Sequence, residues 1–145
     1  MPSQLTVRAE NHGGMLVTAG DGVHGLTMDY PMPGADSDAL AGLTPLRVLL
    51  ASLAGCSANS MAVLLRKMRQ PLSAVEVEAC GLRRDEHPTV FTEISLTFTV
   101  RGAGVDSAAV QKALTLSEEQ ICPVWAMLKP GTPISATFTV VEDRG

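Results

Sequence analysis

The chain has 145 residues, of which 46% are hydrophobic and 18% charged, and its net charge is -4. This length fits one domain, which we expect to span residues 1–145, and the composition is that of a folded protein. The negative charge and the lack of any basic run argue against a nucleic-acid partner. The amino terminus does not resemble a signal peptide, and the apolar stretch 48–58 is too short to cross a bilayer. We therefore expect no membrane association and a cytoplasmic location.

The first part of the chain predicts short β-strands at residues 4–9, 14–19 and 23–29, because turn signals (HGG and AGDG) separate them. The following segment, YPMPGADSDALAGLT, is rich in Pro, Gly, Asp and Ser and predicts a loop over residues 30–44. Loops of this length are uncommon in compact domains unless they have a function.

A long helix is predicted over residues 45–69. Thr44 is a suitable N-cap, Pro45 fits the first helical position, and Pro71 closes the segment. Apolar residues recur at helical spacing, and the first half is apolar on nearly every side. Such a helix lies in the middle of a structure. Because it would be roughly 37 Å long, we expect a second copy of the chain to cover part of it.

The second half of the chain predicts strands at residues 75–80 and 90–101, joined by the turn RRDEHPT, and a last strand at 134–140. Between them, Asp106 is expected to cap a short helix, and the run Ser117-Glu118-Glu119-Gln120 is a capping box that predicts a second helix start. Pro123 requires this helix to kink or restart. The element order predicts an α+β fold with an antiparallel sheet, a long central helix and shorter helices.

Chemistry is most plausible at the cysteines, which are too few for a structural disulfide framework. Cys56 lies on the apolar stripe of the long helix and could be a small buried hydrophobe. Gly55 beside it suggests instead a close approach to the helix backbone, and several small polar residues around it could line a pocket. Cys80 falls on a polar strand face and is expected to be incidental. Cys122 is expected at a helix restart, with its thiolate near free N–H groups, or as a thiol that fills a kink.

A thiolate at Cys56 needs a cation or a hydrogen-bond donor, because burial alone raises a thiol pKa. Arg47 is nine residues away along the helix, and the sequence does not choose among the other candidates, which are His24, Arg83 and Arg84. No CxxC motif occurs, and the histidines show no metal-ligand spacing. Neither a phosphate loop nor a GxSxG motif is present. We expect no metal and no cofactor.

Three segments follow one another between residues 44 and 128: TPLRVLLASLAGCSANSMAVLLRKMRQPL, HPTVFTEISLTFTVRGAGVD and LSEEQICPVWAML. The first resembles the central helix of the OsmC/Ohr family, the second its next strand and turn, and the third its second cysteine segment. This resemblance implies the OsmC-like fold and an intertwined homodimer with two active sites at the interface.

The resemblance also implies a cysteine-based peroxidase that reduces organic hydroperoxides. Cys56 would attack the peroxide and become a sulfenic acid, Cys122 would resolve it to a disulfide, and an external dithiol would reduce the pair. Two features depart from the family pattern: no Arg occurs between Arg8 and Arg47, and Leu46 stands where many members have Glu. The alternative is therefore a weakly active or non-enzymatic dimer that binds a small apolar ligand or acts as a redox switch.

Overall fold

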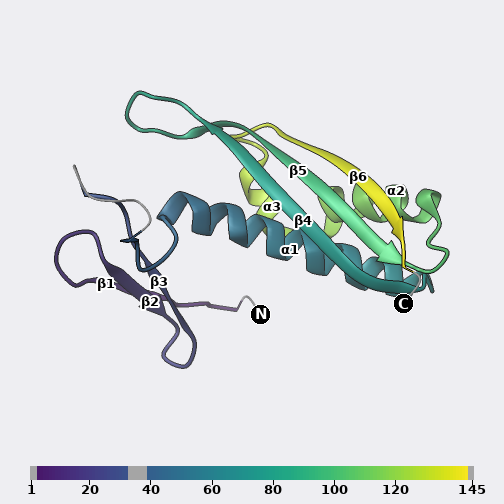
Figure 1. The fold of residues 1–145 in the computed structure, drawn as a ribbon, viewed down its shortest axis with the longest axis horizontal. Coiled ribbons are helices and arrows are strands. Elements are labelled where there is room, and N and C mark those ends of the chain that lie inside the picture. The colour runs from purple at the N-terminus through teal and green to yellow at the C-terminus, as the bar shows by residue number, and fades with distance from the viewer. Residues whose placement is uncertain (1–2, 33–38, 144–145) are drawn as a thin grey trace. The chain divides into compact units, whose positions relative to one another are not determined.

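The computed structural model describes residues 3–32 and 39–143 and is shown in Figure 1. The chain divides into two compact units, Met1–Leu49 and Leu50–Gly145. The boundary falls in the second turn of helix α1 (Pro45–Lys67). Because one helix runs through the boundary, this division does not test whether the chain is a single domain, and the single domain stays a prediction.

The first unit contains a three-stranded antiparallel sheet in the order β1-β2-β3. Its strands are β1 (Arg8–Asn11), β2 (Val17–Gly20) and β3 (Gly25–Met28). Three strands form, as predicted, but all are shorter, and the first is displaced: β1 begins at Arg8 and not at residue 4, and it pairs with β2 from Arg8 opposite Gly20. Asx turns shape the connections. In the second, the Asp21 carboxylate accepts hydrogen bonds from the His24 and Val23 amides, which lowers the pKa of Asp21.

The segment between β3 and α1 is partly outside the described residues, because the predicted loop 30–44 includes residues 33–38. Its described end is held against β3: the Asp29 amide donates to the Leu43 carbonyl at 3.1 Å, and the Asp29 carboxylate accepts from the Ala41 amide at 3.1 Å. At Gly42 the two backbone segments are so close that a Cβ would lie 2.1 Å from the Thr27 carbonyl oxygen. A glycine is therefore needed at that position.

The second unit contains a sheet in the order β4-β5-β6. Its strands are β4 (Leu72–Arg83), β5 (Phe91–Gly102) and β6 (Ile134–Glu142). Strands β4 and β5 form the predicted antiparallel hairpin, whereas β6 runs parallel to β5, so the prediction of a purely antiparallel sheet is wrong at this pair. The physical reason is the long helical connection between β5 and β6, which carries the chain back to the start of β5.

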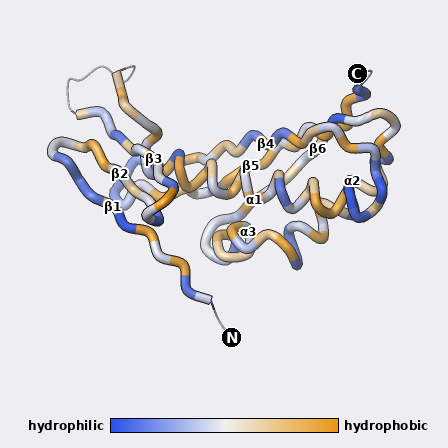
Figure 2. The backbone as a smooth tube through the Cα atoms, turned by 90° about the horizontal axis from the view of Figure 1, so that it is seen from below, coloured by the Kyte–Doolittle hydropathy of each residue, from blue (hydrophilic) through white to orange (hydrophobic). Residues whose placement is uncertain are grey.

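One face of this second sheet is covered by helices and the other is polar. In Figures 1 and 2, helix α1 (from Leu50 onward), α2 (Ser107–Leu116) and α3 (Pro123–Leu128) lie on the same side of β4, β5 and β6. The buried core includes inward-facing β5 residues and facing helix residues: Ile94, Leu96, Phe98, Val100, Leu53, Met61, Leu65, Val110 and Trp125. Cys80 is exposed on the opposite face, as predicted.

The helices after β5 follow the prediction in part. Asp106 caps α2 and accepts a hydrogen bond from the Ala108 amide at 3.0 Å. The capping box at Ser117 is wrong: Ser117 has helical dihedral angles, and α2 continues directly into a π-helical turn, η2 (Ser117–Ile121). The chain then leaves helical geometry at Cys122, and α3 begins with Pro123. The predicted restart at this position is confirmed, because proline fits the first helical position.

Helix α1 begins as predicted, with the Thr44 hydroxyl accepting from the Arg47 amide, and ends at Lys67 before a left-handed residue, Arg69. At 23 residues it is long and apolar enough to cross a membrane by length and composition, contrary to the estimate made from residues 48–58. The core helix of a soluble protein can have the same properties. Buried residues such as Leu53 and Leu65 pack this helix into the core of the second unit. Figure 2 shows that the backbone of α1 is largely hydrophobic, whereas that of β1 is hydrophilic.

Candidate active site

Two cysteines that are distant in sequence meet in the second unit. Cys56 lies in the middle of α1, and Cys122 lies at the junction of η2 and α3. Their Sγ atoms are 3.0 Å apart, and both residues are free thiols in this structure. A disulfide bond has a length of about 2.05 Å, so a shift of roughly 1 Å would join them. The structure thus brings together the two predicted site residues, and Cys80 is not part of the pair.

The surroundings of the two sulfurs differ. Cys122 is 1% exposed and belongs to the core, whereas Cys56 is only partly buried and packs against the edge of the core. The hydroxyl of Ser57, which is fully buried, lies 3.8 Å from Cys122 Sγ. Two consecutive residues of α1 therefore contact Cys122 with different groups: Cys56 with its sulfur and Ser57 with its hydroxyl.

The pKa of the Cys56 thiol is raised above its ordinary value, first by burial and then by the adjoining Cys122 thiol. Two groups act in the opposite direction and lower this pKa, namely a hydrogen bond from the Val124 amide and one from the Ser60 hydroxyl. In this structure the single Ser60 hydroxyl proton is donated to the Cys56 carbonyl at 2.9 Å, so the hydroxyl must rotate to donate to the sulfur when the thiolate forms. Because the sulfurs are so close, ionisation of one disfavours ionisation of the other.

The amide at the start of α3 serves a different sulfur from the one we expected. Cys122 occupies the N-cap position, as predicted, but its side chain makes no capping hydrogen bond. It points to Cys56 instead, and the Val124 amide donates to Cys56. The sequence suggested small polar residues near Cys56, yet it could not indicate that Ser57 and Ser60 face the cysteines or that a backbone amide of another helix completes the site.

None of the principal groups that act on the Cys56 thiol is a cation. Among the candidates, Arg47 is exposed in the first turn of α1, and His24 lies near Asp21 in the first unit, at 3.8 Å. Arg84 donates to two carbonyls of its own hairpin loop, those of Glu86 and His87. Arg83 is exposed at the end of β4. Hydrogen-bond donors are therefore the groups near Cys56 that favour its thiolate.

Two expectations from the sequence concern the surroundings of Gly55 and metal binding. A Cβ added at Gly55 would meet nothing within 4 Å, so no other part of this chain approaches the helix there. Across residues 3–32 and 39–143, no group of three or more His, Cys, Asp or Glu side chains could hold a metal ion.

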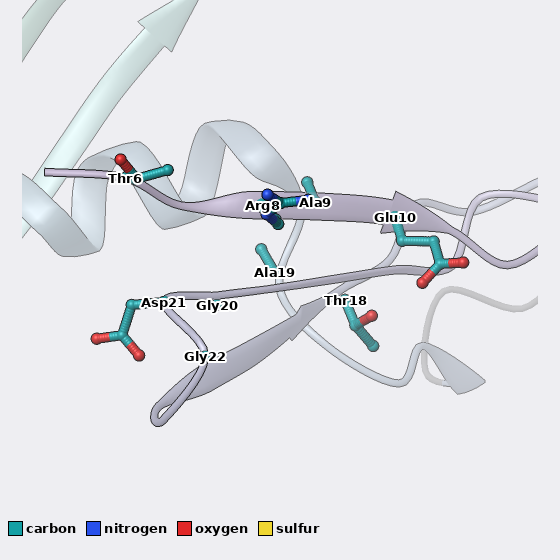
Figure 3. Close-up of a pocket in the computed structure, with 9 residues that line it drawn as sticks. All are labelled: Thr6, Arg8, Ala9, Glu10, Thr18, Ala19, Gly20, Asp21 and Gly22. Atoms are coloured by element: carbon teal, nitrogen blue, oxygen red, sulfur yellow. The ribbon is translucent and has the colours of Figure 1, made fainter.

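A hollow lies in the first unit, on the surface of β1 and β2 (Figure 3). It has a volume of about 760 Å³ and is lined mainly by small residues and by the charged side chains of Arg8, Glu10 and Asp21. In Figure 3 the Glu10 and Asp21 carboxylates lie at opposite ends of this surface. No cysteine lines the hollow, so it is distinct from the cysteine pair.

Comparison with known proteins agrees with this fold. The sequence model of the OsmC-like protein family matches residues 34–137. Protein YhfA of Escherichia coli (strain K12) is 38% identical over 98 residues, which cover 68% of this chain and 73% of YhfA. A hypothetical protein from Aquifex aeolicus VF5 has a similar crystal structure, with a TM-score of 0.85, 25% identity and coverage of 99% of this chain and 100% of that one.

The organic hydroperoxide resistance protein OhrB of Bacillus subtilis shares the fold at lower similarity, with a TM-score of 0.64, 20% identity and coverage of 94% of this chain and 98% of that one. Taken with the family match, these likenesses identify an α+β protein with a long helix and two small sheets. The chain belongs to the OsmC-like protein family.

Proposed function

We propose that this protein is a thiol-dependent peroxidase that reduces organic hydroperoxides with Cys56 and Cys122. The observation that carries the proposal is the 3.0 Å separation of the two free sulfurs. Membership of the OsmC-like family supports a role in peroxide stress, and the shared fold with an organic hydroperoxide resistance protein agrees with it. Cytoplasmic location and the homodimer remain predictions.

The reaction would proceed in three balanced steps. The Cys56 thiolate attacks the terminal oxygen of the hydroperoxide and the O–O bond breaks, which gives a sulfenic acid and an alkoxide. The alkoxide takes up the proton that the Cys56 thiol released and leaves as an alcohol. The Cys122 sulfur then attacks the Cys56 sulfur and the S–O bond breaks. The leaving hydroxide takes up the proton of the Cys122 thiol and departs as water. An external dithiol finally reduces the disulfide and becomes oxidised itself.

The surroundings of Cys56 suit an apolar substrate. Cys56 packs against the hydrophobic core together with partly buried residues such as Leu50 and Val124. Reaction in such a place disfavours charged oxidants, and the Val124 amide and Ser60 hydroxyl supply the hydrogen bonds that the thiolate needs. An alkyl hydroperoxide would fit this environment better than a charged peroxide.

The proposal is tested by adding one equivalent of cumene hydroperoxide to the reduced protein and mapping its thiols by peptide mass spectrometry. We expect the loss of two thiols, a Cys56–Cys122 link and a free Cys80. Cys80 is an internal control, because it is exposed on the face of the sheet that the helices do not cover. Three free thiols after several minutes would contradict the proposal.

A second function is favoured by one observation, which is that the pKa of Cys56 is raised and that no cation is among the principal groups that act on it. A slow thiol of this kind suits a redox switch in a dimer that binds a small apolar ligand. Ligand binding that persists in Cys56→Ser, together with oxidation of the pair without repeated turnover, would support this alternative over the peroxidase.

A further inference from the structure

The two sulfurs of the pair differ in their access to an external thiol. In the single chain, Cys122 is 1% exposed and is enclosed by the core, whereas Cys56 retains contact with solvent. Thiol–disulfide exchange requires the incoming sulfur to approach one sulfur of the disulfide while the other leaves, so the choice depends on which sulfur can be reached. An attack on Cys122 would require the core around it to open first.

Each sulfur also has its own hydrogen-bond donors for the moment at which it leaves. The Ser57 hydroxyl is fully buried and lies 3.8 Å from Cys122 Sγ. Because both groups are buried, bulk water does not solvate the Cys122 sulfur. The Val124 amide and the Ser60 hydroxyl act on Cys56. A hydrogen-bond donor beside a leaving sulfur stabilises the thiolate that forms there.

We infer that the external thiol attacks Cys56 of the oxidised pair, and that Cys122 leaves as a thiolate beside the Ser57 hydroxyl. This inference rests on the proposed function and assigns the order of its last step. The incoming thiolate forms a bond to Cys56 Sγ, the Cys56–Cys122 bond breaks, and the electron pair goes to Cys122 Sγ, which then takes a proton.

The second half of the reduction follows from the same geometry. In the mixed disulfide, Cys56 is bonded to the first sulfur of the dithiol. The second thiol of the dithiol attacks that first sulfur, and Cys56 leaves as a thiolate. Hydrogen bonds from the Val124 amide and the Ser60 hydroxyl stabilise the negative charge on the Cys56 sulfur. Cys56 thus meets both the peroxide and the reductant, while Cys122 reacts only within the protein, and Ser57 is a positioning residue for Cys122.

The first experiment locates the mixed disulfide. The Cys56–Cys122 link is formed in the wild-type protein with diamide, so that the test does not depend on peroxide. The protein is then treated briefly with a large excess of the monothiol N-acetylcysteine, quenched in acid, alkylated after unfolding and mapped. We expect N-acetylcysteine on Cys56 and a free, alkylated Cys122.

Three results would separate the two proposals. N-acetylcysteine on Cys122 would overturn this inference, and so would the absence of any link after diamide. A link that forms with diamide but not with cumene hydroperoxide would overturn only the proposed peroxidase.

The second experiment tests the role of Ser57 by measuring the rate at which N-acetylcysteine reduces the diamide-oxidised protein. Loss of one hydrogen bond to a developing thiolate should slow reduction of Ser57→Ala about threefold to tenfold. The matched control is Ser52→Ala, because Ser52 is an exposed serine on the same helix, and its rate should equal that of wild type. Equal rates for wild type and Ser57→Ala, with both proteins equally folded, would contradict the assignment.

Discussion

The two units of the chain differ in how they hold apolar side chains. In the second unit, a sheet and three helices enclose a continuous core with Phe98 and Trp125 at less than 2% exposure. In the described part of the first unit, each strand has only four residues, and apolar side chains are exposed, such as Leu5 at 93% and Val7 at 68% just before β1, and Leu26 at 46% in β3. A small sheet with so little core is not stable by itself.

This difference indicates where chemistry and association belong. The cysteine pair requires fixed geometry, and it lies in the unit that has the dense core. The first unit instead offers apolar side chains in need of cover, and exposed surfaces of this kind are typical of interaction sites. The predicted homodimer would provide such a cover.

The largest effect should come from the cysteines themselves. Cys56→Ser should abolish turnover of cumene hydroperoxide, because no attacking sulfur remains. Cys122→Ser should still consume one equivalent and keep a sulfenic acid at Cys56, which dimedone labelling followed by mass spectrometry detects. The matched control, Cys80→Ser, should behave as wild type. Full turnover in Cys56→Ser would show that Cys56 is not the thiol that attacks the peroxide.

The core of the second unit should be the most sensitive to truncation. Phe98→Ala removes a fully buried ring and should lower the free energy of unfolding by about 3–5 kcal/mol. Its neighbour on the opposite, exposed face provides the control, and Thr97→Ala should change stability by less than about 0.5 kcal/mol. Urea denaturation measures both, and similar costs at the two positions would contradict the assigned core.

The first unit should respond through association instead of through its own core. Leu26 in β3 is exposed in the single chain, and if a second copy covers it, Leu26→Lys should weaken the dimer at least about tenfold. Thr27→Lys, on the alternate face of the same strand, is the control. Sedimentation velocity over a range of concentrations measures the effect. A wild-type chain that stays monomeric at all concentrations would end this prediction.

The smallest effect concerns pH. Because burial raises the pKa of Cys56, the thiolate fraction at neutral pH is small. The rate of Cys56 alkylation should rise with pH and level off above the value for a free thiol, which is about 8.5. Cys122→Ala removes one group that raises this pKa, so its profile should move toward lower pH. Stopped-flow alkylation provides the profile, and a plateau below neutral pH would imply a cation that we have not found.

Several elements could be predicted because one residue determines them locally. Thr44 and Pro45 mark the start of α1, and Pro123 forces the restart at Cys122. The direction of β6 could not be predicted in this way. Its alternation of apolar and polar residues is the same whether the strand runs parallel or antiparallel, and only the path of the preceding helices decides.

The site was harder to predict than the fold. The resemblance to a known family paired Cys56 with Cys122, whereas their separation in the sequence alone could not. The Val124 amide was missed because a backbone group leaves no mark in the sequence. From the sequence, the free N–H groups at the start of α3 were assigned to the Cys122 sulfur. That assignment was wrong, because the Cys122 side chain makes no capping hydrogen bond and its sulfur contacts Cys56. Side-chain direction at such a junction depends on packing that only the folded chain provides.

The central claim is that Cys56 and Cys122 form a reactive pair and that Cys80 does not belong to it. The most direct measurement follows all three thiols in one sample during reaction with cumene hydroperoxide, by timed acid quenching, isotope-coded alkylation and mass spectrometry. The account predicts that Cys56 and Cys122 disappear together while Cys80 remains. Loss of Cys80 at the same rate as Cys56, or loss of Cys56 without Cys122, would contradict it.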